Sequence, residues 1–275
     1  MYFIMYAGNF FTEVNMEYVA LGKSNLLVSR TAFGAMSLDC QEIEAFGEKA
    51  AEKAGNLVSL AYQNGVNFFD TAHSKPVCEK RLGEALHGIR QNVILATKTN
   101  ANNVEQLKKD LDESLDALNT DFVDLYQIEN PEVIPQKNGS NGIYDELCLL
   151  KEKGVIKHFG IATDNLEIAR NVVTSGLYET LQFPFSMLSP EVIVDFVKMC
   201  QEKDIGFIAM QPLCGGVLNN IPLAFGFLHQ FENVVPVWGA RTPEELEQIL
   251  YFESHPPVID DKFKEEASKT RDFFN

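Results

Sequence analysis

Eight short apolar segments alternate with helical stretches along the chain, and this alternation limits the possible folds more than any other feature. Most segments are continuous runs of β-branched and aromatic residues, which is typical of strands buried on both faces of a parallel sheet. The stretches between them carry apolar residues at spacings of three and four, which predicts amphipathic helices. The segments are RTAFGAM (30–36), VNFFD (66–70), NVILATK (92–98), FVDLYQI (122–128), IKHFGIA (156–162), ETLQFPF (179–185), IGFIAM (205–210) and VVPVW (234–238).

The pattern predicts an α/β fold in which eight parallel strands close into a (β/α)8 TIM barrel. An open, doubly wound sheet is the alternative. That fold normally carries a G-x-G-x-x-G motif after its first strand, and FGAMSL (33–38) contains none. No Pro- or Ser-rich linker divides the chain. We therefore expect a single barrel domain over residues 16–275 and an N-terminal extension over residues 1–15, since MEYVALG at Met16 is itself a natural start.

The composition argues against several classes of partner. The 39 acidic and 23 basic residues give a net charge of −16, which repels phosphate backbones and anionic membranes, so we expect neither nucleic acid nor a membrane as partner. The apolar runs are too short to span a bilayer. The five cysteines are far apart and form no C-x-x-C pair, which predicts a reducing, cytoplasmic location. The oligomeric state cannot be read from these features.

Charged residues end three consecutive predicted strands. Asp70 closes VNFFD, Lys98 closes NVILATK, and Glu129 follows FVDLYQI. The carboxyl ends of barrel strands surround one mouth, so these side chains are expected to share a site although each alone is typical of a solvated strand end. Lys75, on the loop after Asp70, is expected at the same mouth.

Other motifs are weaker. His73, Cys78 and Glu79 resemble metal ligands, but we interpret them as a polar loop followed by a helix start, and with no H-E-x-x-H pattern we expect no metal site. PLCGGVL (212–218) follows the seventh strand, and its two glycines permit the close backbone approach that a phosphate requires. Thr242 and Pro243 begin a helix whose N-terminus suits a phosphate equally well.

Several stretches, in combination and in order, resemble the aldo-keto reductases, which are NAD(P)H-dependent carbonyl reductases built on a (β/α)8 barrel. The resemblance runs from about residue 16 to about residue 252. It is carried by LGKSNLLVSRTAFGAM (21–36), AYQNGVNFFDTAHS (61–74), KRLGEAL (80–86), VILATKT (93–99), TDFVDLYQI (120–128), KGVIKHFGIA (153–162), LQFPFS (181–186), IAMQPLCGG (208–216) and VWGARTPEEL (237–246).

The resemblance implies a reaction in which a hydride passes from nicotinamide to a carbonyl carbon while a tyrosine, assisted by lysine, aspartate and histidine, protonates the oxygen. Asp70 and Lys98 match the aspartate and the lysine. Lys75 stands at the tyrosine position and Glu129 at the histidine position, so the tetrad is degenerate. The two changes balance in charge, which makes a Lys75–Glu129 or Lys75–Asp70 ion pair plausible. A paired ammonium would be a poor proton donor.

The resemblance also implies a cofactor site, with NADP favoured and NAD possible. Phe185 would stack on the nicotinamide, while Gln182, Thr163 and Asp164 would hold its carboxamide, although Asp164 lacks the amide donor usual there. Arg241 could pair with a 2′-phosphate that the nearby Glu245 would repel. The full set implied for the cofactor is Thr163, Asp164, Gln182, Phe185, Pro212, Leu213, Gly215, Gly239, Arg241 and Glu245.

Two functions remain open at the level of sequence. The first is an NAD(P)H-dependent oxidoreductase of aldo-keto reductase type that acts on a small carbonyl compound. Asp70 and Lys98 favour it. The second is a catalytically impaired barrel that binds nucleotide or a partner without reducing carbonyls, and Lys75 and Glu129 favour that reading. The substrate itself cannot be identified from the sequence.

Overall fold

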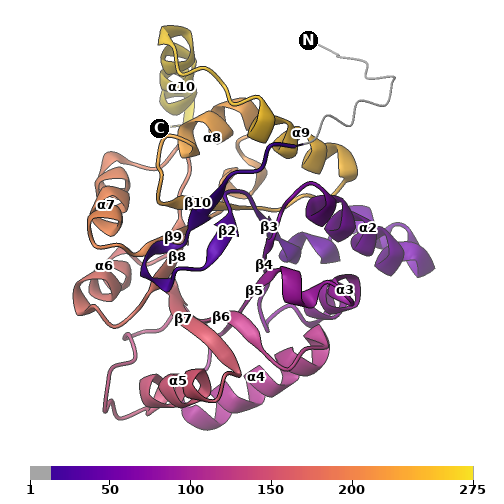
Figure 1. The fold of residues 1–275 in the computed structure, drawn as a ribbon. Coiled ribbons are helices and arrows are strands. Elements are labelled where there is room, and N and C mark those ends of the chain that lie inside the picture. Colours follow the sequence, from indigo (N-terminus) through magenta and orange to yellow (C-terminus); the bar gives the residue numbers. More distant parts are fainter. Residues whose placement is uncertain (1–13, 275) are drawn as a thin grey trace.

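A computed structural model describes residues 14–274 of the chain (Figure 1). Residues 1–13 of the expected N-terminal extension lie outside the described residues. At residue 15 the chain already contacts the body of the protein, since the backbone N–H of Asn15 donates to Ser254 Oγ over 2.9 Å. The division of the chain into an extension and a barrel domain stays a prediction.

Eight parallel strands form a closed barrel in the order β10-β3-β4-β5-β6-β7-β8-β9, which confirms the predicted TIM barrel. Each strand lies within or beside one of the eight apolar segments, because continuous apolar runs suit strands that are covered on both faces. The barrel strands are β3 (Ala32–Gly34), β4 (Phe68–Asp70), β5 (Ile94–Thr99), β6 (Val123–Glu129), β7 (Ile156–Ala162), β8 (Thr180–Pro184), β9 (Gly206–Met210) and β10 (Val234–Trp238).

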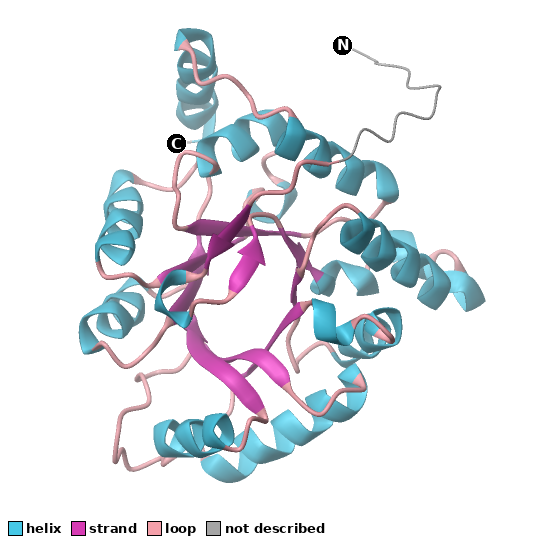
Figure 2. Ribbon diagram, in the orientation of Figure 1, coloured by secondary structure: helices cyan, strands magenta, loops and turns pink. Residues whose placement is uncertain are grey.

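Helices surround the barrel as an outer ring (Figure 2). The apolar faces of the helices from α2 to α9 pack on the outward-facing strand residues, and one large cluster of buried side chains fills the space between the two layers. Helix α10 has no fully buried residue and lies outside this ring, beside α8 (Figure 1). The helices are α1 (Gln41–Glu44), α2 (Ala50–Gln63), α3 (Pro76–Leu86), α4 (Val104–Leu118), α5 (Ile143–Glu152), α6 (Leu166–Ser175), α7 (Glu191–Glu202), α8 (Ile221–Leu228), α9 (Pro243–Ser254) and α10 (Asp261–Phe274).

A smaller cluster of apolar side chains fills the barrel interior. It includes Phe68 of β4, Ala96 of β5 and Leu125 of β6, all fully buried. Successive side chains of a strand point to opposite faces, so residues two positions further along these strands also face inward. Those residues are Asp70, Lys98 and Gln127. The interior is therefore apolar toward the amino ends of these strands and polar toward their carboxyl ends.

A β-hairpin covers the amino end of the barrel (Figure 1). It consists of β1 (Tyr18–Ala20) and β2 (Leu27–Ser29), which pair antiparallel. Leu21 and Val28 of the hairpin pack into the same interior cluster as Phe68. The carboxyl ends of the strands are consequently the end at which loops can build a site.

Among the helices of residues 14–274, none combines the length and the apolar character that crossing a bilayer requires. The cytoplasmic location expected from the cysteines stays a prediction.

Candidate active site

Asp70 and Lys98 form a buried ion pair at the carboxyl ends of β4 and β5. Lys98 Nζ lies 2.8 Å from Asp70 Oδ1 and 2.7 Å from Asp70 Oδ2, and both side chains are nearly inaccessible to solvent. Lys98 Nζ also donates to the carbonyl oxygen of Thr71 over 2.6 Å. An ammonium has three protons to donate, so these three acceptors account for all of them.

Two buried glutamines extend this pair across the barrel. Gln182 Nε2, on β8, donates to Asp70 Oδ2 over 3.1 Å, and Gln182 Oε1 accepts from Gln127 Nε2, on β6, over 2.7 Å. Gln182 is 2% exposed and Gln127 is fully buried. Four strands thus contribute to one hydrogen-bonded network that holds Asp70 from two sides.

Lys75 and Glu129 have no ionic partner within the described part of the chain. Lys75 is exposed just before α3, and its backbone N–H donates to the carbonyl of Ala72 over 2.9 Å. Glu129 is half-buried at the last position of β6, and strand alternation gives it the same face as Gln127. Neither the Lys75–Glu129 nor the Lys75–Asp70 ion pair expected from sequence forms among residues 14–274. Lys75 is the residue that precedes the first turn of α3, and its side chain makes no hydrogen bond within the described part of the chain.

The expected carboxamide contacts lie on adjacent strands. The backbone N–H of Thr163 donates to the carbonyl of Gln182 over 3.0 Å, so the end of β7 lies directly against β8. Thr163 is buried, and its hydroxyl accepts from the N–H of Asn165 at the start of α6. Asp164 is exposed, and its N–H donates to Asn130 Oδ1 over 3.2 Å. The Asp164 carboxylate therefore faces solvent at the rim.

The loop after β9, where the sequence predicts close approach of a phosphate, turns tightly. Four of its residues have positive φ angles: Gln211 at 57°, Cys214 at 51°, Gly215 at 67° and Gly216 at 92°. An added Cβ at Gly215 or Gly216 would meet nothing within 4 Å, so the outer side of the turn is open to a ligand. The preceding Pro212 is buried and Leu213 is half-buried, which fixes the turn to the barrel.

Arg241 lies at the entry to α9 and is already paired. Its guanidinium contacts Glu245 at 2.7 Å and Glu42 at 3.0 Å, and its backbone N–H donates to Glu245 Oε2 over 2.9 Å. The hydrogen bonds to Glu245 raise the pKa of Arg241 above its ordinary value. Gly239, two residues earlier, is exposed and has Ser37 as the nearest neighbour to an added Cβ, at 3.7 Å. A 2′-phosphate would have to compete with two carboxylates for Arg241.

The structure corrects the expected position of the Phe185 ring. Phe185 is 1% exposed and packs in the outer core against Phe207, Phe227 and Phe231, with ring centroids 5.8, 5.4 and 5.1 Å away. The physical reason is strand alternation, because the residue lies an odd number of positions from the inward-facing Gln182. Phe185 therefore cannot stack on a ligand in the mouth.

Met210, unlike Phe185, lies at the mouth of the barrel. It ends β9, lies two residues after the inward-facing Ile208, and pairs in register with Pro184. Its side chain is half-buried, so it is accessible at the rim. A thioether is polarisable and packs well against ring systems.

His73, Asp110 and Glu113 form a further polar cluster, whose residue types are those of a metal site. His73 Nε2 lies 2.9 Å from Glu113 Oε2, while His73 Nδ1 lies 3.8 Å from Asp110 Oδ1. The two ring nitrogens thus face different carboxylates. Asp110 is also held by Thr99 and Gln106. One donor atom of each of these three residues lies within 4.8 Å of the other two. The expectation of no metal site stays a prediction.

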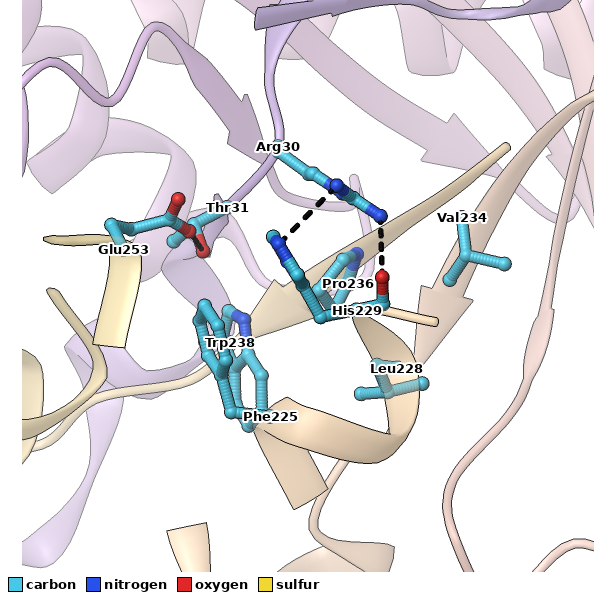
Figure 3. Close-up of a pocket in the computed structure, with 9 residues that line it drawn as sticks. All are labelled: Arg30, Thr31, Phe225, Leu228, His229, Val234, Pro236, Trp238 and Glu253. Atoms are coloured by element: carbon cyan, nitrogen blue, oxygen red, sulfur yellow. Dashed lines mark hydrogen bonds between the residues drawn. The ribbon is translucent and has the colours of Figure 1, made fainter. Parts of the chain in front are cut away.

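Another buried polar cluster lies between β10, helices α8 and α9, and the two residues that precede the amino end of β3 (Figure 3). Arg30 donates to the carbonyl of His229 over 2.8 Å and contacts Glu17 at 2.7 Å. Thr31 donates to Glu253 Oε1. Glu253 Oε2 and Trp238 Nε1 are buried beside a cavity of about 10 Å³ and have no partner among the described residues. Burial raises the pKa of Glu253 above its ordinary value.

Comparison with known proteins decides the family. The profile of the aldo/keto reductase family matches residues 30–223, which is more than half of the chain. The chain belongs to the aldo/keto reductase family. L-galactose dehydrogenase from Arabidopsis thaliana is 28% identical over 244 residues, which cover 83% of this chain and 72% of that protein. An uncharacterised oxidoreductase from Bacillus subtilis is 26% identical over 219 residues, which cover 74% of this chain and 67% of that protein.

Solved structures of aldo-keto reductases share the fold. The holo form of an enzyme from Bacillus halodurans superposes with a TM-score of 0.77 at 22% identity and covers 93% of this chain and 96% of its own. An enzyme from Klebsiella pneumoniae, solved in complex with NADPH, has a TM-score of 0.77 at 17% identity and covers 93% of this chain and 95% of its own.

Sequence reasoning missed two residues of this aldo-keto reductase site. Gln127 belongs to the buried network and Met210 lies at the rim. The signal for both is the period of two along a strand. Counting back from Glu129 reaches Gln127 on the same face, and counting on from Ile208 reaches Met210.

Proposed function

We propose that this protein is an NAD(P)H-dependent oxidoreductase that acts on a small carbonyl compound through a site built on Asp70, Lys75, Lys98 and Glu129. The observation that carries the proposal is the Asp70–Lys98 ion pair. It is buried at the carboxyl ends of β4 and β5 in a chain that belongs to the aldo/keto reductase family. A buried charge pair is costly unless its hydrogen bonds are satisfied, and here they are. This site is thus built in advance of any ligand.

The residues present fit a nicotinamide dinucleotide. The open turn at Gly215 and Gly216 and the capped start of α9 at Thr242 suit its phosphates. Thr163 lies against Gln182, and the resemblance implies both for the carboxamide. Relatives support this assignment, since the Klebsiella pneumoniae enzyme was solved with NADPH. NADP remains our preference, although Glu42 and Glu245 occupy Arg241.

When bound, the cofactor supplies a hydride to the carbonyl carbon. The protein must then supply a proton to the carbonyl oxygen. Lys98 is a poor candidate for direct transfer, because Asp70 and Thr71 accept all three of its protons. Lys75 and Glu129, which have no ionic partners among residues 14–274, are the remaining candidates. Lys98 would act as a fixed positive charge beside the developing oxyanion.

A second function is favoured by one specific observation. Lys75 is exposed and outside the buried network, whereas the donor of a reductase must contact the reacting oxygen. A barrel that binds nucleotide without reducing carbonyls is consistent with that position.

Cofactor binding is the first test. NADPH and NADH are titrated into the protein while quenching of Trp238, the single tryptophan, and the shift of the unfolding temperature are followed. Saturable quenching and a positive shift with at least one nucleotide are expected. An absence of both effects with both nucleotides would remove the proposed reductase.

Turnover separates the two functions. We expect consumption of NADPH that depends on a small aldehyde or ketone and disappears in Lys98→Met. Binding without such consumption would favour the non-reducing barrel. The double variant Lys75→Tyr with Glu129→His is expected to raise turnover by roughly 10²-fold to 10⁴-fold, the usual contribution of a positioned proton donor.

A further inference from the structure

Gln127 has two features that stability alone does not explain. It is fully buried toward the carboxyl end of β6, in register with Lys98 of β5. One end of its amide donates to Gln182 over 2.7 Å, while the other end, Oε1, is buried with no partner among the described residues. An unsatisfied buried acceptor is unfavourable. An apolar side chain of similar size would avoid it.

The orientation of both amides follows from the charge on Asp70. A carboxylate can only accept hydrogen bonds, so the atom of Gln182 that faces Asp70 Oδ2 at 3.1 Å must be Nε2. Gln182 Oε1 then faces Gln127, so the Gln127 atom that contacts it must be the donor Nε2. Gln127 Oε1 consequently points away and has no partner among the described residues. The unpaired oxygen is therefore the consequence of a directed chain of amides whose N–H groups all point toward Asp70.

From this geometry we propose that Gln127 is a positioning residue that acts through Gln182 to hold Asp70, and with it Lys98, in the orientation that the reduction requires. The inference rests on the function proposed above. Without the Gln127 donor, the Gln182 amide is free to rotate and Asp70 loses one of its two fixed partners. Gln127 does not contact the substrate in this assignment.

The first test follows the Gln182 side-chain amide directly and needs no turnover. In protein labelled with ¹⁵N-glutamine, hydrogen exchange of that amide is compared between the unmodified protein and Gln127→Leu. We expect exchange about tenfold faster in the variant, the factor that corresponds to losing one ordinary hydrogen bond. Thr180→Val is the matched control, because Thr180 is also buried inside the barrel and its hydroxyl has no partner among residues 14–274. Unchanged exchange in Gln127→Leu would overturn the proposal.

Gln127→Glu adds a readout that a purely structural role would not produce. When protonated, the glutamate can donate to Gln182 Oε1 as the native amide does, and when ionised it repels that oxygen. Protection of the Gln182 amide should therefore be close to native at low pH and lost as the pH rises. A protection level that does not change with pH in this variant would contradict the assignment.

Kinetics extend the test if the protein reduces carbonyls. Gln127→Leu should then lower kcat about tenfold with KM for the carbonyl changed less than twofold, because an interaction made chiefly in the transition state is weakened. Thr180→Val should leave both constants unchanged. A rise in KM at constant kcat would overturn the positioning role. A complete lack of turnover in the unmodified protein would refute the proposed function, while the exchange experiments would still decide the role of Gln127.

Discussion

The two ends of the barrel both bury charged groups, but they balance them differently. At the carboxyl end, Asp70 and Lys98 pair directly and every Lys98 proton has an acceptor. At the amino end, Glu253 is held by Thr31 on one oxygen only, and its second oxygen has no partner among the described residues (Figure 3). The difference shows that the mouth is preorganised, whereas the amino-end cluster keeps an unfavourable charge that burial penalises.

Removing Lys98 should have the largest effect on stability. Lys98→Met leaves the Asp70 carboxylate buried without its counter-charge, and losing one partner of a buried pair costs about 3–5 kcal/mol of unfolding free energy. Denaturant unfolding measures this change. Lys80→Met, at an exposed position of α3, is the control and should change stability by less than about 0.5 kcal/mol.

A double variant sharpens that result. Asp70→Asn combined with Lys98→Met removes both charges, so most of the loss caused by Lys98→Met should be recovered. Equal destabilisation by Lys98→Met and Lys80→Met would show that the Asp70–Lys98 pair does not contribute to the free energy of unfolding. The two ends of the barrel would then not differ in the way described above.

Replacing Glu253 should change the unfolding free energy by an intermediate amount, and it should stabilise the protein where Lys98→Met destabilises it. Burial raises the pKa of Glu253, so the native state binds this proton more tightly than the unfolded chain does. The native state therefore loses stability as the pH rises from the ordinary glutamate value of about 4.3 through the raised pKa. Glu253→Gln removes that loss, and we expect it to be more stable than the unmodified protein at pH 8 by on the order of 1 kcal/mol.

The pH dependence distinguishes charge from packing at this position. Unfolding free energies of both proteins are measured from pH 4 to pH 8, and the advantage of Glu253→Gln should shrink toward pH 4. Glu247→Gln, on the exposed side of α9, is the control and should show no such trend. A pH-independent difference would mean that the Glu253 carboxylate is not penalised.

The barrel was predictable because its signal is repeated and local. Each strand is a short apolar run between helices, and a run covered on both faces needs no knowledge of its partners to be recognised. Asp70 and Lys98 were predictable for a related reason, since both lie at strand ends and strand ends of a barrel meet at one mouth. The structure brings them into direct contact.

Details of the site depend on information that local patterns do not carry. The direction of the Phe185 ring depends on which face of the strand an odd or even position takes. The run LQFPF has apolar residues on both faces, so residue type does not show which of them point into the barrel. The pairing of Lys75 was expected from a charge count, but charge balance says nothing about distance. The helix start at Pro76 places Lys75 in solvent, and no ion pair forms for it among residues 14–274.

Arg241 should give the smallest effect, because its pairs are exposed. Its ion pairs with Glu245 and Glu42 lie in solvent, where such pairs contribute about 0.2–1 kcal/mol and are screened by salt. Glu245→Gln removes one charge but keeps an oxygen that can accept from the Arg241 backbone N–H, so the start of α9 should remain intact.

Freed from one carboxylate, Arg241 should bind a 2′-phosphate more tightly. We expect the ratio of the Kd for NADH to the Kd for NADPH to rise about threefold in Glu245→Gln at low salt, and the gain to shrink at 0.5 M salt. Fluorescence titration measures both dissociation constants. Glu247→Gln serves again as the control, because Glu247 is exposed on the same helix and makes no hydrogen bond or ion pair with Arg241 among the described residues. An unchanged ratio would mean that Arg241 does not contact the adenosine end of the cofactor, and the preference for NADP would lose the single cation that the sequence offers for it.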